Sequence, residues 1–178
     1  MGIILGDPYT TLRNILEKEI IEFNTLSILD IGTGYGHGLK IILDVLDRKI
    51  DFSIYCIDSS SDSIEWLREN FKMYRDVYFK KALAEYLPFP DNFFNIAILS
   101  LVLHHIRMIE RALKEVLRVV KPNGYINIID WTQRAHIHDP QLLRNSMSRV
   151  LNFIKTIKYK SIYREVDDHY YLVIRKSL

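Results

Sequence analysis

Glycines concentrate in the segment ILDIGTGYGHG, residues 28–38, which holds four of the seven glycines of this 178-residue chain and one acidic residue. Glycine loses more backbone entropy on folding than any other residue, so such a cluster indicates positive φ angles or backbone close to another molecule. Asp30 precedes Gly32, Gly34 and Gly36 in a DxGxGxG pattern. Its carboxylate would repel a pyrophosphate and attract a cation. The pattern therefore predicts a site for a positively charged ligand.

A second acid, Asp58, follows an apolar run and lies 22 positions after Gly36. Acids at this place in α/β nucleotide sites accept hydrogen bonds from ribose hydroxyls. The dinucleotide fingerprint itself is not matched, because its third glycine would stand at His37 or Leu39. A nicotinamide-dependent oxidoreductase is therefore the less favoured function for this pattern.

Histidines supply candidates for proton transfer. His104 and His105 follow an apolar run, and an imidazole that titrates near neutral pH can act as a general base. The alternative is a framework role, with one ring bonded to backbone and the other lining the pocket. His136 and His138 precede Asp139, but two histidines are too few ligands and Asp139 is explained as a helix cap, so we expect no metal.

Two apolar patterns alternate along the chain and indicate the elements that position these residues. Asp7 and Asp139, each followed by proline, predict helix starts, and Asp62 with Glu65 resembles a capping box. A further helix is predicted over 108–120, ended by a turn at KPNG, and a hairpin around Asp167 and Asp168. Buried strands are predicted at 26–31, 52–57, 76–80, 93–102 and 125–130.

Alternating strands and helices predict an α/β fold, with a parallel sheet covered by helices on both faces and an antiparallel hairpin at its edge. Ligands of such sheets bind at the carboxyl ends of the strands, where strand order reverses. The glycine segment follows the first strand, so we expect the site there.

Composition narrows the class of protein. The chain is 48% hydrophobic and 26% charged with a net charge of +2, as in ordinary globular proteins, and the charge does not indicate nucleic-acid binding. Its single cysteine, Cys56, excludes an intrachain disulfide and is expected in the core. No apolar run reaches the roughly 18 residues of a membrane span, and MGIILGDPYT does not resemble a signal peptide. We therefore expect a cytoplasmic protein.

Four segments between residues 28 and 130 together form a recognisable pattern: ILDIGTGYG, YCIDSSSDSIEWLREN, AEYLPFPDNFFNIAILSLVLHHI and ALKEVLRVVKPNGYINIID. In order and spacing the chain resembles class I S-adenosylmethionine-dependent methyltransferases of the quinone-biosynthesis type. The resemblance implies a Rossmann-like doubly wound sheet of seven strands, order 3-2-1-4-5-7-6 with strand 7 antiparallel. It implies one domain over 1–178, with an N-terminal helix in 1–25, a cofactor-binding core in 26–130, and a helix and hairpin in 131–178.

The resemblance also implies how S-adenosylmethionine is held. The backbone of Gly32–Gly36 would pass under the methionine part, with Asp30 near its amino group, Asp58 at the ribose, and Ala84 and Glu85 beside the adenine. A Cβ at Gly32 or Gly34 would then occupy space that the cofactor needs. The full set implied is Asp30, Gly32, Thr33, Gly34, Gly36, Asp58, Ser59, Ala84, Glu85 and Ser100, with His104 and His105 as candidate catalytic residues.

Two positions depart from the family pattern. Leu83 stands where many relatives have an acid that binds the adenine amino group, so Glu85 or backbone groups would replace it. Asn95 stands where an acid precedes strand four, and it keeps the acceptor capacity without the charge.

The methyl acceptor is not indicated by the residues, and a small molecule, a protein and an RNA all stay open. Tyr9, Tyr35 and Trp131 either pack or touch the acceptor. Basic residues without an acid between 141 and 164 form either a solvated surface or a docking surface: Arg144, Arg149, Lys155, Lys158, Lys160 and Arg164.

Little sequence remains for a substrate lid, since only nine residues, WTQRAHIHD, lie between strand five and the next helix. We expect either an open site for a large acceptor or a homodimer in which a second subunit completes the pocket. The same feature leaves open a cofactor-binding subunit without transferase activity.

Overall fold

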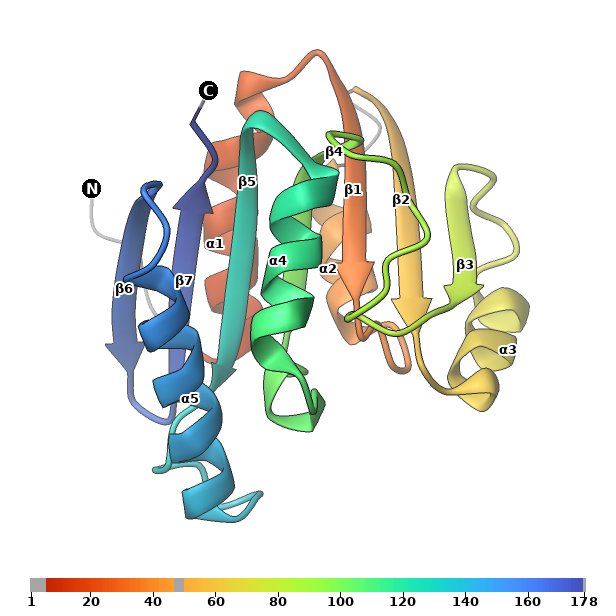
Figure 1. Cartoon of the computed structure of the whole chain (residues 1–178). Helices are drawn as coiled ribbons and strands as arrows, with labels where there is room; N and C mark the ends of the chain where they lie inside the picture. Colours follow the sequence, from red (N-terminus) through yellow and green to blue (C-terminus); the bar gives the residue numbers. More distant parts are fainter. Residues whose placement is uncertain (1–5, 47–49, 178) are drawn as a thin grey trace.

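A mixed sheet of seven strands forms the centre of the described part of the chain, residues 6–46 and 50–177 of a computed structural model (Figure 1). The strand order is β3-β2-β1-β4-β5-β7-β6; β1 to β5 run parallel and β7 pairs antiparallel with β5 and β6. This confirms the order and the antiparallel strand that the sequence implied. Residues 1–5, part of the segment expected to lack a signal peptide, lie outside the described residues.

A helix follows each of β1, β2 and β4, as is usual for parallel crossovers, whereas β3 is joined to β4 by the loop of residues 82–93. The bounds of the elements are α1 Pro8–Glu19, η1 Ile20–Glu22, β1 Thr25–Ile31, α2 His37–Leu46, β2 Asp51–Asp58, α3 Ser61–Asn70, β3 Val77–Lys81, β4 Phe94–Ser100, η2 Leu103–His105, α4 Ile109–Val119, β5 Val120–Trp131, α5 Pro140–Ile154, β6 Lys160–Val166 and β7 His169–Arg175.

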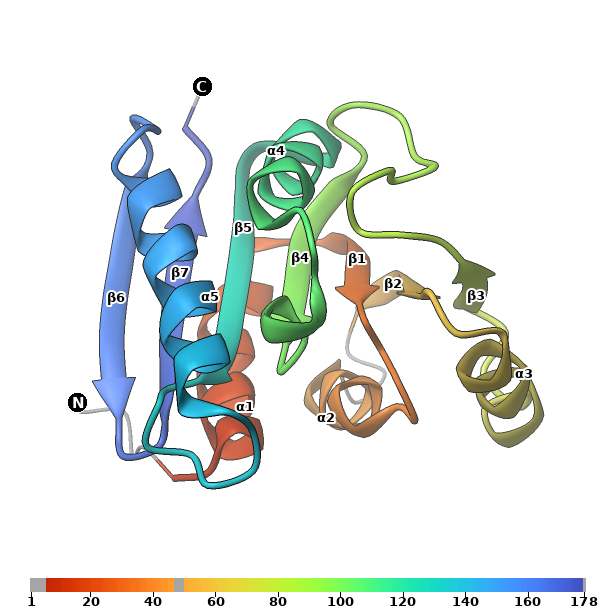
Figure 2. The ribbon, with the colours of Figure 1, turned by 60° about the horizontal axis from the view of Figure 1, so that its bottom comes forward.

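Each face of the sheet is buried under its own helices, as Figure 2 shows for α4 on one side and α2 and α3 on the other. Alternate residues of one strand serve the two cores: Ile28 of β1 packs with α1, α2 and α3, and Leu29 packs with α4 and α5. Both side chains are fully buried, as is Cys56 of β2. The continuous apolar runs of the sequence therefore reflect strands covered on both faces.

Two of the predicted helix starts are confirmed and one is wrong. Asp7 accepts from Tyr9 N and Thr10 N, and Asp139 accepts from Gln141 N, which confirms both caps. The predicted capping box at Asp62 is wrong, because α3 begins earlier. Its cap is Ser60, whose hydroxyl accepts from Ser63 N and leaves Asp62 inside the first turn.

The other differences concern strand ends. The KPNG segment is not a turn: β5 begins directly after α4 at Val120, and its pairing with β4 shifts register between Phe94 and Ile96. An irregularity of this kind absorbs extra residues within a strand, so the chain needs no separate loop. At the opposite end β4 stops at Ser100, because Leu101 takes a positive φ of 57°.

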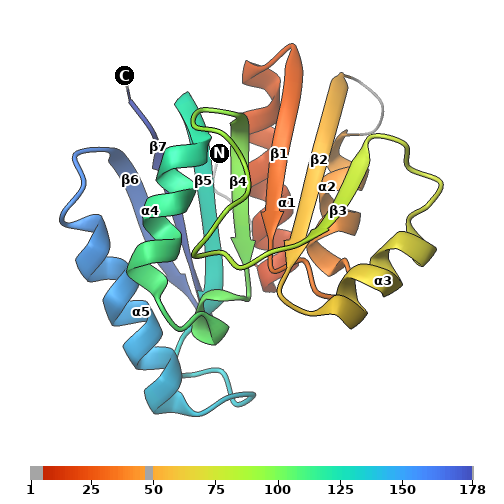
Figure 3. The ribbon, with the colours of Figure 1, turned by 45° about the vertical axis from the view of Figure 1, so that its right-hand side comes forward.

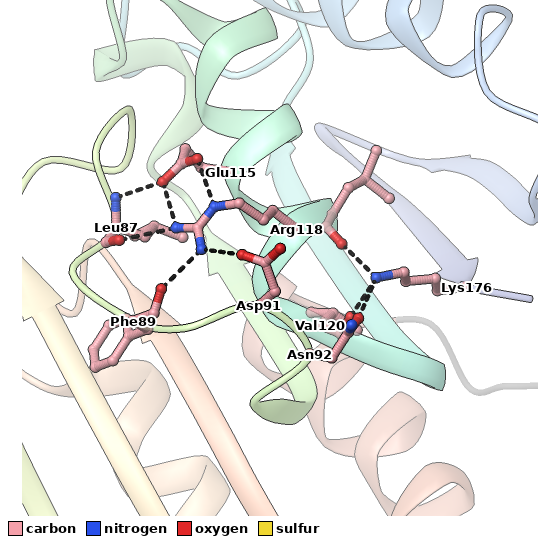
Figure 4. Close-up of polar contacts among 9 residues, drawn as sticks. Leu87, Phe89, Asp91, Asn92, Glu115, Arg118, Val120 and Lys176 are labelled. Carbon is pink, nitrogen blue, oxygen red and sulfur yellow. Dashed lines mark hydrogen bonds and ion pairs between the residues drawn. The ribbon is translucent and has the colours of Figure 1, made fainter. Parts of the chain in front are cut away.

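The loop of residues 82–93 leaves β3 and crosses the sheet on the side of α4 before it enters β4 (Figures 1 and 3). Its far end is held by the loop clamp, a cluster formed by Asp91, Asn92, Glu115, Arg118 and Lys176 with nearby carbonyls (Figure 4). Arg118 donates to Leu87 O, Phe89 O, Asp91 and both oxygens of Glu115 at 2.7–3.0 Å. The loop is thereby fixed to α4.

Within the described residues, none of the helices combines the length and the apolar character that crossing a membrane would require.

Candidate cofactor and active site

Asp30 lies at the carboxyl end of β1 with 2% of its surface exposed. Its Oδ2 atom is buried and has no hydrogen-bond partner among the described residues. Burial raises the pKa of this carboxyl to about 7, and the charge of nearby Asp58 adds to the increase. A buried acid without an internal partner costs stability, so its environment favours a ligand that brings a positive charge.

The three glycines after Asp30 all have positive φ angles but differ in what surrounds them. A Cβ on Gly34 would meet no atom within 4 Å and would project into open space. A Cβ on Gly32 would lie 2.2 Å from Val102, and one on Gly36 would lie 2.8 Å from Phe71. Close packing within the protein therefore already requires glycine at Gly32 and Gly36, and Gly34 is the position whose bare backbone faces open space.

Asp58 closes this turn from the end of β2. Its Oδ2 accepts from Gly34 N at 2.9 Å, and its Oδ1 accepts from Ser60 N at 2.9 Å. Each carboxylate oxygen has a further lone pair, so two hydroxyl groups can still be accepted. Asp58 thus holds the glycine turn in place and stays half-buried at its rim. The adjacent Ser59 is exposed.

A cavity of about 230 Å³ is lined by Asp30, Gly32, Thr33 and Gly34, together with Tyr9, Tyr35, Ser100 and Leu101. Ser100 Oγ is a second buried polar atom without a partner among the described residues. Thr33 is buried and donates to the Asp30 carbonyl at 3.1 Å. Trp131, which the sequence grouped with the two tyrosines, lies at the end of β5 and pairs with His169.

A larger hollow of about 1080 Å³ lies by the start of β2, at the opposite edge of the sheet. Arg13 and Asp44 both line this hollow and form an ion pair with each other, so neither of these two charges needs a ligand. The smaller cavity is the better candidate site, because its buried polar atoms have no internal partners.

The crossing loop presents the residues implied for adenine. Ala84 and Glu85 are buried, and Leu83 is 51% exposed beside them. Glu85 Oε1 accepts from Met108 N at 3.4 Å, and Arg111 donates to the Glu85 carbonyl at 3.1 Å. The Glu85 carboxylate is therefore directed toward the start of α4. Asn95 lies away from this loop and accepts from Ser27 and Lys121, so its acceptor capacity is used in folding.

His104 is the candidate base whose ring is held by a side-chain hydrogen bond to a carboxylate. Its Nδ1 lies 2.6 Å from Asp130 Oδ1, both side chains are 1% exposed, and its backbone N donates to Asp130 Oδ2 at 3.0 Å. The carboxylate fixes the tautomer with the proton on Nδ1 and a lone pair on Nε2. His105 is exposed overall, but part of its ring is desolvated. This desolvation lowers the pKa of His105, and the neighbouring His104 and His138 rings lower it further.

The sequence reasoning missed Asp130 and did not connect His138 with His104. Asp130 ends the fifth strand, and a carboxylate at the carboxyl end of a buried strand was the available signal. His138 was considered with His136, but its Nε2 lies 3.2 Å from His104 Nε2, whereas His136 is exposed. No local pattern links residues 34 positions apart in the chain.

Comparison with known proteins agrees with this geometry. The profile of a family described as "Methyltransferase domain" matches residues 29–128. The ubiquinone/menaquinone biosynthesis C-methyltransferase UbiE of Rickettsia bellii is 29% identical over 120 residues, which are 65% of this chain and 48% of that protein. The uncharacterized methyltransferase YcgJ of Bacillus subtilis is 31% identical over 106 residues, 58% of this chain and 40% of that protein.

The fold has solved counterparts as well. A SAM-dependent methyltransferase of Aquifex aeolicus superposes with a TM-score of 0.73 at 21% identity, covering 96% of this chain and 98% of that one. Fold and site together define a Rossmann-like S-adenosylmethionine-binding domain. The chain belongs to the class I S-adenosylmethionine-dependent methyltransferase family, and it spans about half the length of the curated relatives it matches.

The residues present fit the family's cofactor. The unpartnered carboxylate of Asp30 suits the ammonium of the methionine part, and the open space at Gly34 leaves room for its chain. Asp58 keeps acceptor capacity for the ribose hydroxyls.

Proposed function

We propose that this chain catalyses methyl transfer from S-adenosylmethionine to an acceptor that arrives at the carboxyl edge of the sheet. The observation that carries the proposal is the buried Asp30 Oδ2, which has no partner among the described residues and lines the cavity beside Gly34. When bound, the cofactor supplies an electrophilic methyl group on a sulfonium.

The chain contributes alignment and proton acceptance. Asp30, Asp58 and the turn at Gly34 would hold the cofactor so that the acceptor atom can approach in line. The sulfonium would supply the methyl group and would keep the electron pair of its sulfur–methyl bond. For a hydroxyl or carbon acceptor, the released proton goes to Nε2 of His104, with Asp130 stabilising the imidazolium. An amine or thiolate acceptor needs no base.

Calorimetric titration with S-adenosylmethionine, S-adenosylhomocysteine and NADH tests the cofactor. We expect micromolar binding of the first two and none of NADH. Asp58→Ala should weaken cofactor binding by about 1–3 kcal/mol, because a charged acceptor is lost. Unchanged affinity in that variant would show that the ribose lies elsewhere.

The acceptor class is tested with labelled methyl donor and fractionated cell extract, separated into protein, RNA and small molecules. Label in one fraction identifies the class, and His104→Gln should reduce the rate by about 100-fold or more if a base is used. Cofactor binding without transfer to any fraction would favour a non-catalytic subunit. The homodimer expectation is tested by light scattering at micromolar concentration, where a strict monomer contradicts it.

A further inference from the structure

Three imidazoles from two separate segments meet beside the carboxyl ends of β4 and β5. His104 and His105 lie on η2, and His138 lies on the loop before α5. One nitrogen of each ring lies within 4.8 Å of the other two, and the His104 ring centroid is 4.1 Å from that of His105 and 4.5 Å from that of His138. We propose that this cluster binds a divalent transition-metal ion of the Zn²⁺ class.

The spacing of two of the nitrogens already suits such an ion. His104 Nε2 and His138 Nε2 are 3.2 Å apart. Two imidazole nitrogens bound to one tetrahedral Zn²⁺ lie roughly 3.3–3.4 Å from each other, given Zn–N bonds of about 2.0–2.1 Å. His105 is the exposed member, so rotation of its side chain can bring the third nitrogen closer without repacking the core.

A carboxylate behind the cluster fixes the ligand that cannot move. Asp130 binds His104 Nδ1 at 2.6 Å and also accepts from Trp131 N at 2.9 Å, so both partners are held. Histidines that bind metals usually donate their other ring N–H to such a carboxylate. With the His104 proton on Nδ1, the lone pair of His104 Nε2 faces His138, and His138 Nε2 is then the donor in their contact. A metal ion would replace the proton on His138 Nε2.

The ligand set selects the class of ion. Three neutral imidazoles suit Zn²⁺ and neighbouring transition ions, whereas Mg²⁺ and Ca²⁺ require oxygen ligands. Three protein ligands also leave one coordination position open, as in sites that bind a water or a substrate atom. The inference does not depend on methyl transfer. Because His104 Nε2 cannot be a ligand and a base together, an ion at this site would take over deprotonation of a bound hydroxyl or thiol.

Calorimetric titration of chelator-treated, tag-free protein with ZnCl₂ tests the site without cofactor. We expect one ion per chain at micromolar affinity or better, and a Co²⁺ absorption spectrum characteristic of nitrogen ligands. His138→Gln should weaken Zn²⁺ binding at least about tenfold. His136→Gln is the matched control, because His136 is an exposed histidine on the same loop outside the cluster.

Equal Zn²⁺ affinity of His138→Gln and the unmodified chain would overturn the site, as would equal losses in the His138→Gln and His136→Gln variants. Absence of Zn²⁺ binding at micromolar concentration in the unmodified chain would also overturn it. If His138→Gln does not fold, the Co²⁺ spectrum of the unmodified chain decides. Titration of His138→Gln with S-adenosylmethionine separates the two proposals, because the cofactor should still bind when the metal does not.

Discussion

Two polar regions of this chain, the loop clamp around Arg118 and the cofactor cradle formed by Asp30, the glycine turn, Asp58 and Ser100, satisfy their hydrogen bonds in opposite ways. Arg118 makes five hydrogen bonds, one for each of its N–H groups, and Lys176 Nζ donates three (Figure 4). In the cradle, Asp30 Oδ2 and Ser100 Oγ are buried without a partner among the described residues.

The difference indicates what each region is for. In the clamp, the groups that hold the loop pair with one another, because a buried polar atom without a partner costs about 1–3 kcal/mol. Groups that bind a ligand keep that cost until the ligand arrives. Substitutions should therefore have opposite effects in the two regions, on stability in the clamp and on ligand affinity in the cradle.

The largest expected effect is on cofactor affinity in Asp30→Asn. Removing the buried charge that faces the ammonium should weaken S-adenosylmethionine binding by about 2–5 kcal/mol. Stability at pH 8 should stay the same or increase, since a neutral amide costs less to bury than an unpaired carboxylate. Calorimetry and urea unfolding measure the two effects, and Asp76→Asn, an exposed acid, is the control with the same change in charge.

The same carboxyl makes binding depend on pH. Because its pKa is raised to about 7, Asp30 is protonated below that pH in the free protein and must release a proton to pair with the ammonium. Cofactor affinity should fall by up to about tenfold for each pH unit below 7 and level off above it. A pH dependence that persists unchanged in Asp30→Asn would contradict this assignment.

In the loop clamp, the largest effect on stability is expected for Arg118→Met. The variant leaves the Phe89 carbonyl without its side-chain donor and leaves the Leu87 carbonyl and the Glu115 carboxylate with backbone donors alone, which should cost about 2–4 kcal/mol of unfolding free energy. Arg13→Met is the matched control, because the Arg13 side chain is 35% exposed against 31% for Arg118 and pairs only with Asp44 among the interactions described. Its loss should stay below about 1 kcal/mol. Equal urea midpoints for the two variants would remove the distinction.

Gly34→Ala and Gly36→Ala compare ligand space with packing inside the cradle. Both positions have positive φ, so both variants carry a similar backbone strain of about 1–2 kcal/mol. Gly36→Ala also collides with Phe71, which should destabilise it by about 1–3 kcal/mol more. Gly34→Ala should fold and lose cofactor affinity. Should titration and urea unfolding show the reverse pattern, Gly34 would serve the turn and not the ligand.

The strand order followed from the resemblance to the family, and the two proline-led helix starts followed from apolar period and capping residues, which are local signals. The position of the site stays a prediction. The errors of the sequence prediction were local as well: Ser60 competes with Asp62 for the same helix end, and KPNG resembles a turn although it lies within β5. The contact of His138 with His104, which binds Asp130, depends on the path of the loop of residues 132–139, which no spacing rule specifies.

The smallest expected effect concerns a third polar site, the contact between α1 and β5. Glu19 is 5% exposed; its Oε2 accepts from Asn127 Nδ2 at 2.6 Å, and Glu19 Oε1 and Asn127 Oδ1 have no partner among the described residues.

Burial raises the pKa of the Glu19 carboxyl from its ordinary 4.5 to about 8. The folded state thus holds a proton that the unfolded chain releases, and the contribution to stability is lost as pH rises from about 4.5 to about 8. Glu19→Gln stays neutral throughout, so its unfolding free energy relative to the unmodified chain should increase by about 1 kcal/mol between pH 5 and pH 6. Glu17→Gln, which replaces an exposed acid on the same helix, should show no such trend in urea unfolding across this range.

Parallel profiles of unfolding free energy against pH for Glu19→Gln and the unmodified chain would mean that Glu19 is ionised in the fold. Glu19 would then be, like Asp30, a buried charge without an ionic partner. The division between folding groups that pair with one another and ligand groups that do not would fail at this contact.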